Sequence, residues 1–128
     1  MNEFVFSKRS LKNLEGVHHD LVEVAHRALS LSPIDFVIID GVRTIEEQRI
    51  LVAKGKSKTM DSRHLTGHAI DIAAWMNGSI SWDFGLYEKI TDAFDMAAGR
   101  LKTPIICGID WPSFVDAGHI ELDRRRYP

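Results

Sequence analysis

Apolar residues in the first third of the chain recur at the spacing of a helix that buries one face. Between Leu11 and Leu31 they fall three or four positions apart, and Pro33 ends the segment. The residues on this face are Leu14, Val17, Leu21, Val24, Ala25, Ala28 and Leu29. We therefore expect one apolar helix face over 11–31, followed by a buried strand at Phe36–Ile39.

Two later segments also have helical signals. Thr44 and Glu47 form a capping-box pattern and Gly55 is a plausible stop, which predicts a short helix over about 45–54. A second amphipathic helix is expected at 84–101. Its apolar positions are Phe84, Tyr87, Ile90, Ala93, Phe94, Ala97, Ala98 and Leu101.

Short strands are predicted mainly in the second half of the chain. The segment "HAIDIAAWM" at 68–76 alternates enough to be a strand, and the turn at Asn77–Gly78 closes it. The segments "TPIICGID" and "GHIEL" suggest two more strands, at 103–110 and 118–122. Helices and strands are thus mixed, which predicts an α+β fold with a small, mostly antiparallel sheet packed with helices.

Composition narrows the classes of function. The 128 residues fit one domain, so we expect a single domain over 1–128. The formal net charge of −2 gives no basic excess, so nucleic acid is not an expected partner. Cys107 is the single cysteine and is expected to be buried. It excludes an internal disulfide and a thiolate cluster, so any metal must be bound by His, Asp or Glu.

The start of the chain, "MNEFVFSKRSLKN", is too polar for a secretory signal. No stretch reaches the roughly 18 apolar residues of a membrane span. We therefore expect a protein that is made in a cytoplasm and does not insert into a membrane.

The segment "SRHLTGHAID" at 62–71 concentrates polar chemistry. His64 and Asp71 are seven positions apart, and on one strand an odd spacing puts side chains on opposite faces. His64 is therefore better placed on a loop or strand end, with Gly67 allowing the turn. Catalytic zinc usually has three protein ligands and one open position. His119 is the natural third candidate, and Glu121 shares its face two residues on.

The residue pattern itself is more specific than the spacing. It matches Ser-x-His-x-x-Gly-x-Ala-x-Asp at Ser62, His64, Gly67, Ala69 and Asp71. This pattern resembles the M15 family of zinc D-Ala-D-Ala carboxypeptidases, the VanY group, and the related phage L-alanyl-D-glutamate endopeptidases. The resemblance implies the Hedgehog and D-Ala-D-Ala peptidase type of fold.

Two further elements agree with this resemblance, in the family's order. The family has an acidic residue three positions before its last histidine ligand, as in "DAGH" at 116–119. "GVRTIEEQ" at 41–48 looks like the family's Gly-x-Arg-[Ser/Thr]-x-x-x-Gln segment. The three elements together span 41–122, and the chain resembles the phage endolysin branch most.

The resemblance implies a zinc site and a set of residues around it. Three side chains would bind the zinc: His64, Asp71 and His119. Asp116 would be the general base for the attacking water, although many family members have Glu at this position. We expect the chain to turn at Ala117-Gly118 so that Asp116 faces the metal, and Gly118 tolerates positive φ.

The resemblance also implies roles for three residues that do not bind the metal. Arg43 would hold a substrate carboxylate or stabilise the tetrahedral oxyanion. Ser62 and Glu121 are assigned to orienting the ligand side chains.

Each site residue has a simpler interpretation as well. Arg43 could pair with Glu46 or Glu47 on the next helix. Asp71 could cap a strand end, and Asp116 could merely end a turn.

Four other residues are expected mostly outside the site. His18, His19 and His26 are expected to be solvated helix residues, and His68 stands at a variable motif position. Trp111 could line the cleft.

The favoured function is a zinc peptidase that cuts the L-Ala–D-Glu bond of peptidoglycan stem peptides, as a phage endolysin released to the cell wall. One alternative is a D-Ala-D-Ala carboxypeptidase or dipeptidase of cell-wall remodelling. Another is a non-catalytic zinc-containing binding module, for which the Hedgehog signalling domain is the precedent. The presence of both Asp116 and Arg43 favours the enzyme.

Overall fold

A computed structural model describes residues 2–128 as helices and short strands. The first half contains α1 (Lys8–Asn13), α2 (His19–Leu31), β1 (Phe36–Asp40), α3 (Ile45–Ala53) and the 3-10 turn η1 (Arg63–Thr66). The second half contains β2 (Ala69–Met76), β3 (Ser79–Ser81), α4 (Phe84–Leu101), β4 (Ile105–Cys107), the 3-10 turn η2 (Gly108–Asp110) and β5 (His119–Leu122).

The strands form one sheet in the order β1-β2-β5-β4, and β3 pairs with the end of β2. Each of the pairings is antiparallel. β2 lies between β1 and β5, so its residues contact both neighbours. The predicted α+β fold with an antiparallel sheet is confirmed.

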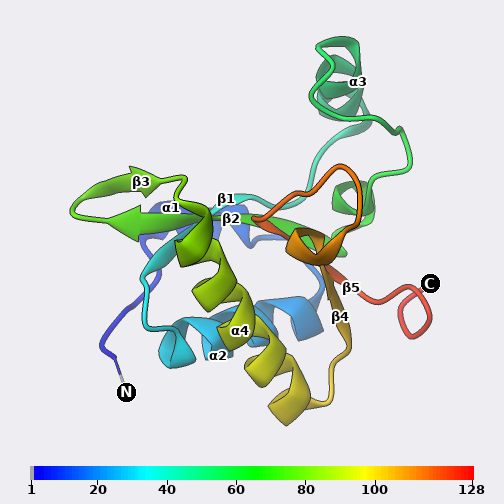
Figure 1. Cartoon of the computed structure of the whole chain (residues 1–128). Helices are drawn as coiled ribbons and strands as arrows, with labels where there is room; N and C mark the ends of the chain where they lie inside the picture. The colour runs from blue at the N-terminus through cyan, green and yellow to red at the C-terminus, as the bar shows by residue number, and fades with distance from the viewer. Residues whose placement is uncertain (1) are drawn as a thin grey trace.

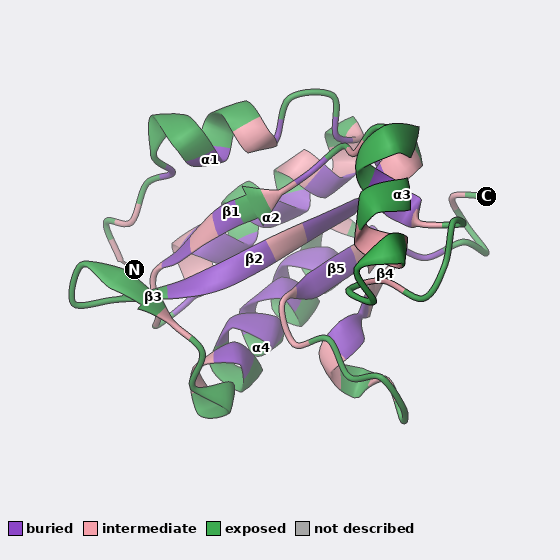
Figure 2. Cartoon of the chain, turned by 90° about the horizontal axis from the view of Figure 1, so that it is seen from above, coloured by how far each residue is buried: buried purple, intermediate pink, exposed green. Residues whose placement is uncertain are grey.

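The two faces of the sheet have different environments. α2 and α4 pack together below the sheet, and α3 projects on the other side (Figure 1). The largest buried side chains, which include Phe36, Ile72 and Phe94, fill the space between the sheet and these two helices. Figure 2 shows buried positions along β2 and β5 and on α4. The helices therefore support one face of the sheet and leave the face beneath α3 for a site.

The predicted helix face over 11–31 is broken into two helices. α1 ends at Asn13, Gly16 takes a φ of +81°, and α2 begins at His19. Leu14 and Val17 are nevertheless buried, as the pattern predicted. A connecting loop that turns its apolar residues toward the core keeps the spacing of a helix, which is why the pattern concealed the break.

The other predicted helices are confirmed with small differences at their ends. The helix expected at 84–101 has these bounds in the structure, and the one expected at about 45–54 ends at Ala53. The capping box is present in both directions, because Thr44 Oγ1 accepts from Glu47 N and Glu47 Oε1 accepts from Thr44 N.

The strands differ more from the prediction. The segment 103–110 is a strand only at Ile105–Cys107 and then becomes η2. The turn at Asn77–Gly78 has φ values of 51° and 82°, which suits a type I′ hairpin, and it leads into β3, which was not predicted. Within residues 2–128, no helix is both long and apolar enough to cross a membrane.

Candidate active site

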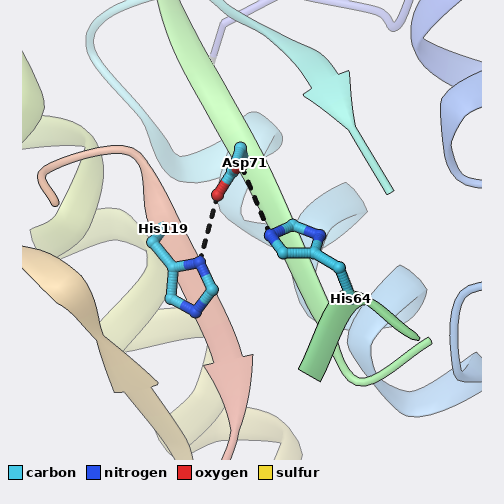
Figure 3. Close-up of side chains that lie close together, drawn as sticks. All are labelled: His64, Asp71 and His119. Carbon is cyan, nitrogen blue, oxygen red and sulfur yellow. Dashed lines mark hydrogen bonds and ion pairs between the residues drawn. The ribbon is translucent and has the colours of Figure 1, made fainter. Parts of the chain in front are cut away.

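Three side chains far apart in the sequence meet on the face of the sheet beneath α3. His64 comes from η1, Asp71 from β2 and His119 from β5 (Figure 3). One ligand atom of each lies within 4.8 Å of those of the other two. Asp71 and His119 are direct partners in the antiparallel pairing of β2 with β5. Asp71 is therefore not a strand-end cap.

His64 is placed as the sequence predicted, on a turn before the strand. Gly67 ends η1 with a φ of +76°, which redirects the chain into β2. His64 Nδ1 lies 2.7 Å from the carbonyl oxygen of Gly41, so Nδ1 carries the proton and donates it. The lone pair of Nε2 then points toward Asp71, whose Oδ2 is 3.3 Å away.

His64 Nε2 is buried and has no hydrogen-bond partner among residues 2–128, because its contact with Asp71 lacks hydrogen-bond geometry. A buried polar atom without a partner costs about 1–3 kcal/mol. A metal ion would satisfy it. Two imidazole nitrogens and one carboxylate are also a donor set that suits a divalent transition metal. The cluster therefore fits a metal ion.

The electrostatics of the cluster also favour a cation at this point. Burial favours the neutral form of Asp71, but its contacts with His119 and His64 outweigh burial and hold the pKa of Asp71 well below its usual range. Burial opposes charge on His119 too, yet the bonds to Asp71 and Glu121 raise the pKa of His119 to about 9. Without a metal, a protonated His119 supplies the positive charge that balances Asp71.

Glu121 and Ser62 contact the ligand residues from the sides away from the cluster centre. His119 Nε2 lies 2.9 Å from Glu121 Oε1, while its Nδ1 faces Asp71 Oδ1 at 3.1 Å. Ser62 Oγ accepts from the backbone N–H of His64 at 3.2 Å and caps η1. Glu121 thus fixes an imidazole ring, and Ser62 fixes the turn that carries the other one.

Arg43 does not pair with Glu46 or Glu47, which was its simpler interpretation. Its Nε donates to Asp40 Oδ2 at 2.6 Å and its Nη2 donates to Asp71 Oδ2 at 3.0 Å. A third bond runs from Nη1 to Gln48 Oε1 at 3.0 Å. The guanidinium is therefore fixed beside the cluster of His64, Asp71 and His119 and lines the same cleft.

Asp116 lies on the loop before β5 and also lines the cleft. Asp116 is exposed at the mouth of the cleft, yet partial desolvation by the surrounding protein and the nearby Asp71 carboxylate raise its pKa, although His119 and His64 act in the opposite direction. The backbone on both sides is fixed, since Asp116 N donates to Gly108 O and Asp116 O accepts from His119 N. A carboxylate with a raised pKa is suited to accept a proton near neutral pH.

Gly118 was expected to be needed because a turn before His119 would require positive φ, and this expectation was wrong. Gly118 is not among the glycines with positive φ. Its carbonyl accepts from Ile72 N at 2.8 Å, and a Cβ at Gly118 would lie 2.4 Å from Ile72 O. The chain needs glycine here because β2 passes too close for a side chain.

Sequence reasoning assigned no role to Gln48, although it stands at the last position of the Gly-x-Arg segment. Gln48 is the buried residue of α3. Its amide binds Arg43 and donates to Ser57 Oγ at 2.9 Å and Thr59 O at 2.6 Å. Gln48 therefore joins Arg43 to the loop 56–61. Its position in the same family segment as Arg43 was the feature of the sequence that could have indicated this role.

Of the other aromatic and histidine positions, Trp111 does line the cleft, and its ring lies 5.1 Å from that of His119. His68 instead bonds Thr66 Oγ1 and packs against His18, away from the cleft.

Two of the three histidines expected to be solvated, His19 and His26, are exposed. The expectation for His18 was wrong, because it caps α2 by accepting from Asp20 N and packs on Tyr127. Cys107 is buried, as predicted.

Comparisons with known proteins agree with this geometry. The family model described as "Phage L-alanyl-D-glutamate peptidase" matches residues 2–123. A protein named L-alanyl-D-glutamate peptidase from Escherichia phage T5 is 40% identical over 128 residues, covering 97% of this chain and 93% of that protein. One of the same name from Listeria phage A118 is 30% identical and covers 99% of this chain, which spans 45% of that longer protein.

Solved structures point the same way. The crystal structure of Serratia marcescens L-Ala D-Glu endopeptidase ChiX has a TM-score of 0.92 and 39% identity, covering 98% of this chain and 96% of that one. The vancomycin-resistance D,D-dipeptidase VanXYg shares the fold, with a TM-score of 0.53, 17% identity and coverage of 83% and 50% of the two chains. The chain belongs to the phage L-alanyl-D-glutamate peptidase family.

Proposed function

We propose that this protein is a zinc-dependent endopeptidase that hydrolyses the bond between L-Ala and D-Glu in the stem peptide of bacterial peptidoglycan. The observation that carries the proposal is the convergence of His64, Asp71 and His119 on one point beside a cleft of about 410 Å³. Two relatives that match nearly all of this chain, at 39–40% identity, are named for cleavage at this bond.

The metal proposed for the cluster is zinc, held by the Nε2 atom of His64, a carboxylate oxygen of Asp71 and the Nδ1 atom of His119. Zinc accepts a set of two imidazoles and one carboxylate and leaves a position open. When bound, it lowers the pKa of water toward neutrality and polarises a carbonyl group. Glu121 would keep the second proton of His119 on Nε2, so that Nδ1 is free to bind.

Asp116 is proposed as the general base. It faces the cleft together with His64 and His119, and its raised pKa brings it closer to the pH at which it works. It would accept a proton from the attacking water and deliver it to the D-Glu nitrogen as the peptide bond breaks.

Arg43 is proposed to stabilise the negative charge that develops on the carbonyl oxygen. Its three bonds to Asp40, Gln48 and Asp71 fix the guanidinium before substrate arrives, so little reorganisation is needed in the transition state. A planar guanidinium has five N–H donors, and these bonds leave others for the substrate.

Residues 1–128 are proposed to act as one catalytic unit on the cell wall, as a lysis enzyme of phage origin would. The non-catalytic alternative is disfavoured because a binding module has no need for Asp116 and Arg43 at the edge of the metal cluster. The D-Ala-D-Ala carboxypeptidase alternative has the VanXYg fold in its favour, and that likeness shows the fold alone.

Mass spectrometry of digested peptidoglycan separates these possibilities. The zinc-loaded protein is expected to release stem peptides with a new D-Glu amino terminus, and a chelator should prevent their release. Free D-Ala as the product would replace the endopeptidase proposal with the carboxypeptidase. Unchanged peptidoglycan with zinc-loaded, folded protein would contradict both enzymes.

A further inference from the structure

The part of the cleft lined by the loop 56–61 and the segment after β5 carries an excess of positive charge. The loop 56–61 contributes Lys56 and Lys58, and Arg124 from the C-terminal segment lines the same cleft. The acid in this part of the cleft, Asp61, pairs with Arg124 at 3.2 Å. Within residues 2–128, no carboxylate oxygen lies within 4.0 Å of either lysine ammonium. The lysine charges are therefore available to a ligand.

Lys58 is also held in place without being neutralised. Its ammonium lies 4.5 Å from the centre of the Phe114 ring, which belongs to the loop before β5. A cation on an aromatic face is attracted by the ring and keeps its charge and N–H donors. The contact therefore joins the two loops that line the cleft and leaves a cation between them.

Phe114 adopts a backbone conformation that a bulky residue rarely takes. Its φ is 53°, in the left-handed region, and its side chain is 51% exposed. Such a conformation is strained and is found most often at active sites and ligand clamps. Burial of the ring does not explain it, since half of the side chain is in solvent. The contact with Lys58 accounts for the position of the Phe114 ring at the cleft.

The proposed substrate has the complementary charge. A D-Glu residue that is linked through one carboxyl group keeps the other as a free carboxylate, close to the bond that is cut. The stem then continues through a diamino acid, which in some walls carries another free carboxylate. The remaining donors of Arg43 are proposed for the oxyanion, so a carboxylate on the D-Glu side requires another cation of the cleft.

Resting on the proposed function, we infer that Lys58, seated on Phe114, binds a free carboxylate on the D-Glu side of the scissile bond and so determines specificity. The enzyme then prefers stem peptides with free carboxylates over amidated ones. A charge-assisted hydrogen bond in a partly exposed cleft is expected to give a preference of about tenfold in kcat/KM, equivalent to about 1.4 kcal/mol.

Three synthetic peptides containing L-Ala–D-Glu and the diamino acid test this inference. One has every carboxylate free, one is amidated on D-Glu, and one is amidated on the diamino acid. The wild-type protein should cut one amidated peptide about tenfold less efficiently than the free peptide, and that peptide identifies the carboxylate. Lys58→Gln should lose this discrimination mainly through KM for the free peptide, and Lys58→Arg should keep it.

Lys54→Gln is the matched control, because it removes the same charge from the exposed end of α3, away from the cleft. Equal discrimination by the wild type, Lys58→Gln and Lys54→Gln would overturn the inference, as would a wild type that cuts all three peptides equally well. Both results leave the proposed function intact. Failure of the zinc-loaded wild type to cut any of the peptides would overturn the proposed function and the inference together.

Discussion

Asp71 is the residue on which the polar contacts of the site converge. Its two oxygens contact His119, His64 and Arg43 at 3.0–3.3 Å, from three different parts of the chain. A buried carboxylate is stable only when it is paired and hydrogen-bonded. The same contacts hold the ligands close together before any metal binds, so the site is largely preorganised.

Replacement of Asp116 tests whether it acts as the base. Asp116→Asn keeps the size of the side chain but cannot take up a proton, so the rate should fall roughly 10²–10⁴-fold, as it should for Asp116→Ala. Metal content should be unchanged, because Asp116 is not among the clustered ligands. Peptide-cleavage kinetics and metal analysis measure both quantities. Substantial activity in metal-loaded Asp116→Asn would make Asp116 a turn residue and Glu121 the next candidate.

Arg43→Lys tests the fixed guanidinium. An ammonium cannot contact Asp40, Gln48 and Asp71 together as the guanidinium does. We expect kcat to fall by about 10²-fold, the lower range for loss of an oxyanion donor, while bound metal is retained. Arg49→Lys, on the exposed side of α3, is the control and should be active. Near-normal turnover in Arg43→Lys would leave Arg43 with a structural role only.

Single residues could be selected from the sequence where chemistry restricted the choice, and the structure brings the three selected ligand candidates together, while their binding of a metal stays a prediction. His64, Asp71 and His119 could be selected because few residue types bind zinc and their pattern is specific. His18 could not be placed, because Tyr127, on which its ring packs, is brought to it by tertiary structure rather than by local sequence. Gln48 stands at the last position of the Gly-x-Arg segment, but a single glutamine indicates no particular reaction or ligand. Its role, to hold Arg43, became visible only in the structure.

At the scale of elements, helices were easier to predict than strands. α4 has eighteen residues with a continuous apolar face and an Asp83 cap, so its bounds follow from the pattern. β3 has three residues, too few for an alternation to be recognised, and it was missed. β4, also three residues long, was expected within 103–110 but with bounds that were too wide. Both pair with the edge of another strand, β3 with β2 and β4 with β5. The length of an element, and whether it depends on pairing with a distant strand, therefore decided how well the sequence predicted it.

Gly118 connects an element-scale contact to the site. Gly118→Ala would place a Cβ 2.4 Å from Ile72 O, so β5 must shift away from β2, and His119 shifts with it. We expect a loss of roughly 1–3 kcal/mol in the free energy of unfolding together with weaker metal binding. Denaturant unfolding and metal titration measure the two effects.

The matched control is Gly99→Ala on α4, where a Cβ would meet nothing within 4 Å. Alanine is the better helix former, so this change should leave stability unchanged or raise it by up to about 1 kcal/mol. If Gly118→Ala were as stable and bound metal as well as Gly99→Ala, the close approach of the two strands would not be a constraint.

At the scale of the whole molecule, the site joins parts of the fold that are otherwise held by different contacts. β2 and β5 pack on the core below the sheet (Figure 1), whereas η1 and the segment 41–44 belong to the connections that follow and precede α3. His64 bonds Gly41 O, and Arg43 N donates to His64 O. A metal bound by all three ligands would therefore tie η1 and the base of α3 to the sheet.

Metal removal should consequently lower the stability of the fold as well as abolish activity. A ligand that binds only the native state stabilises it by about 4 kcal/mol at a thousandfold excess over its Kd. Chelation of the wild type should lower the Tm by several degrees, and added zinc should restore it. His119→Ala removes one ligand and the charge that balances Asp71, so its Tm should be low and should respond little to chelator or zinc. Metal analysis should find little zinc in this variant. An equal response of the Tm to zinc in His119→Ala and the wild type would mean that the stabilising ion binds elsewhere.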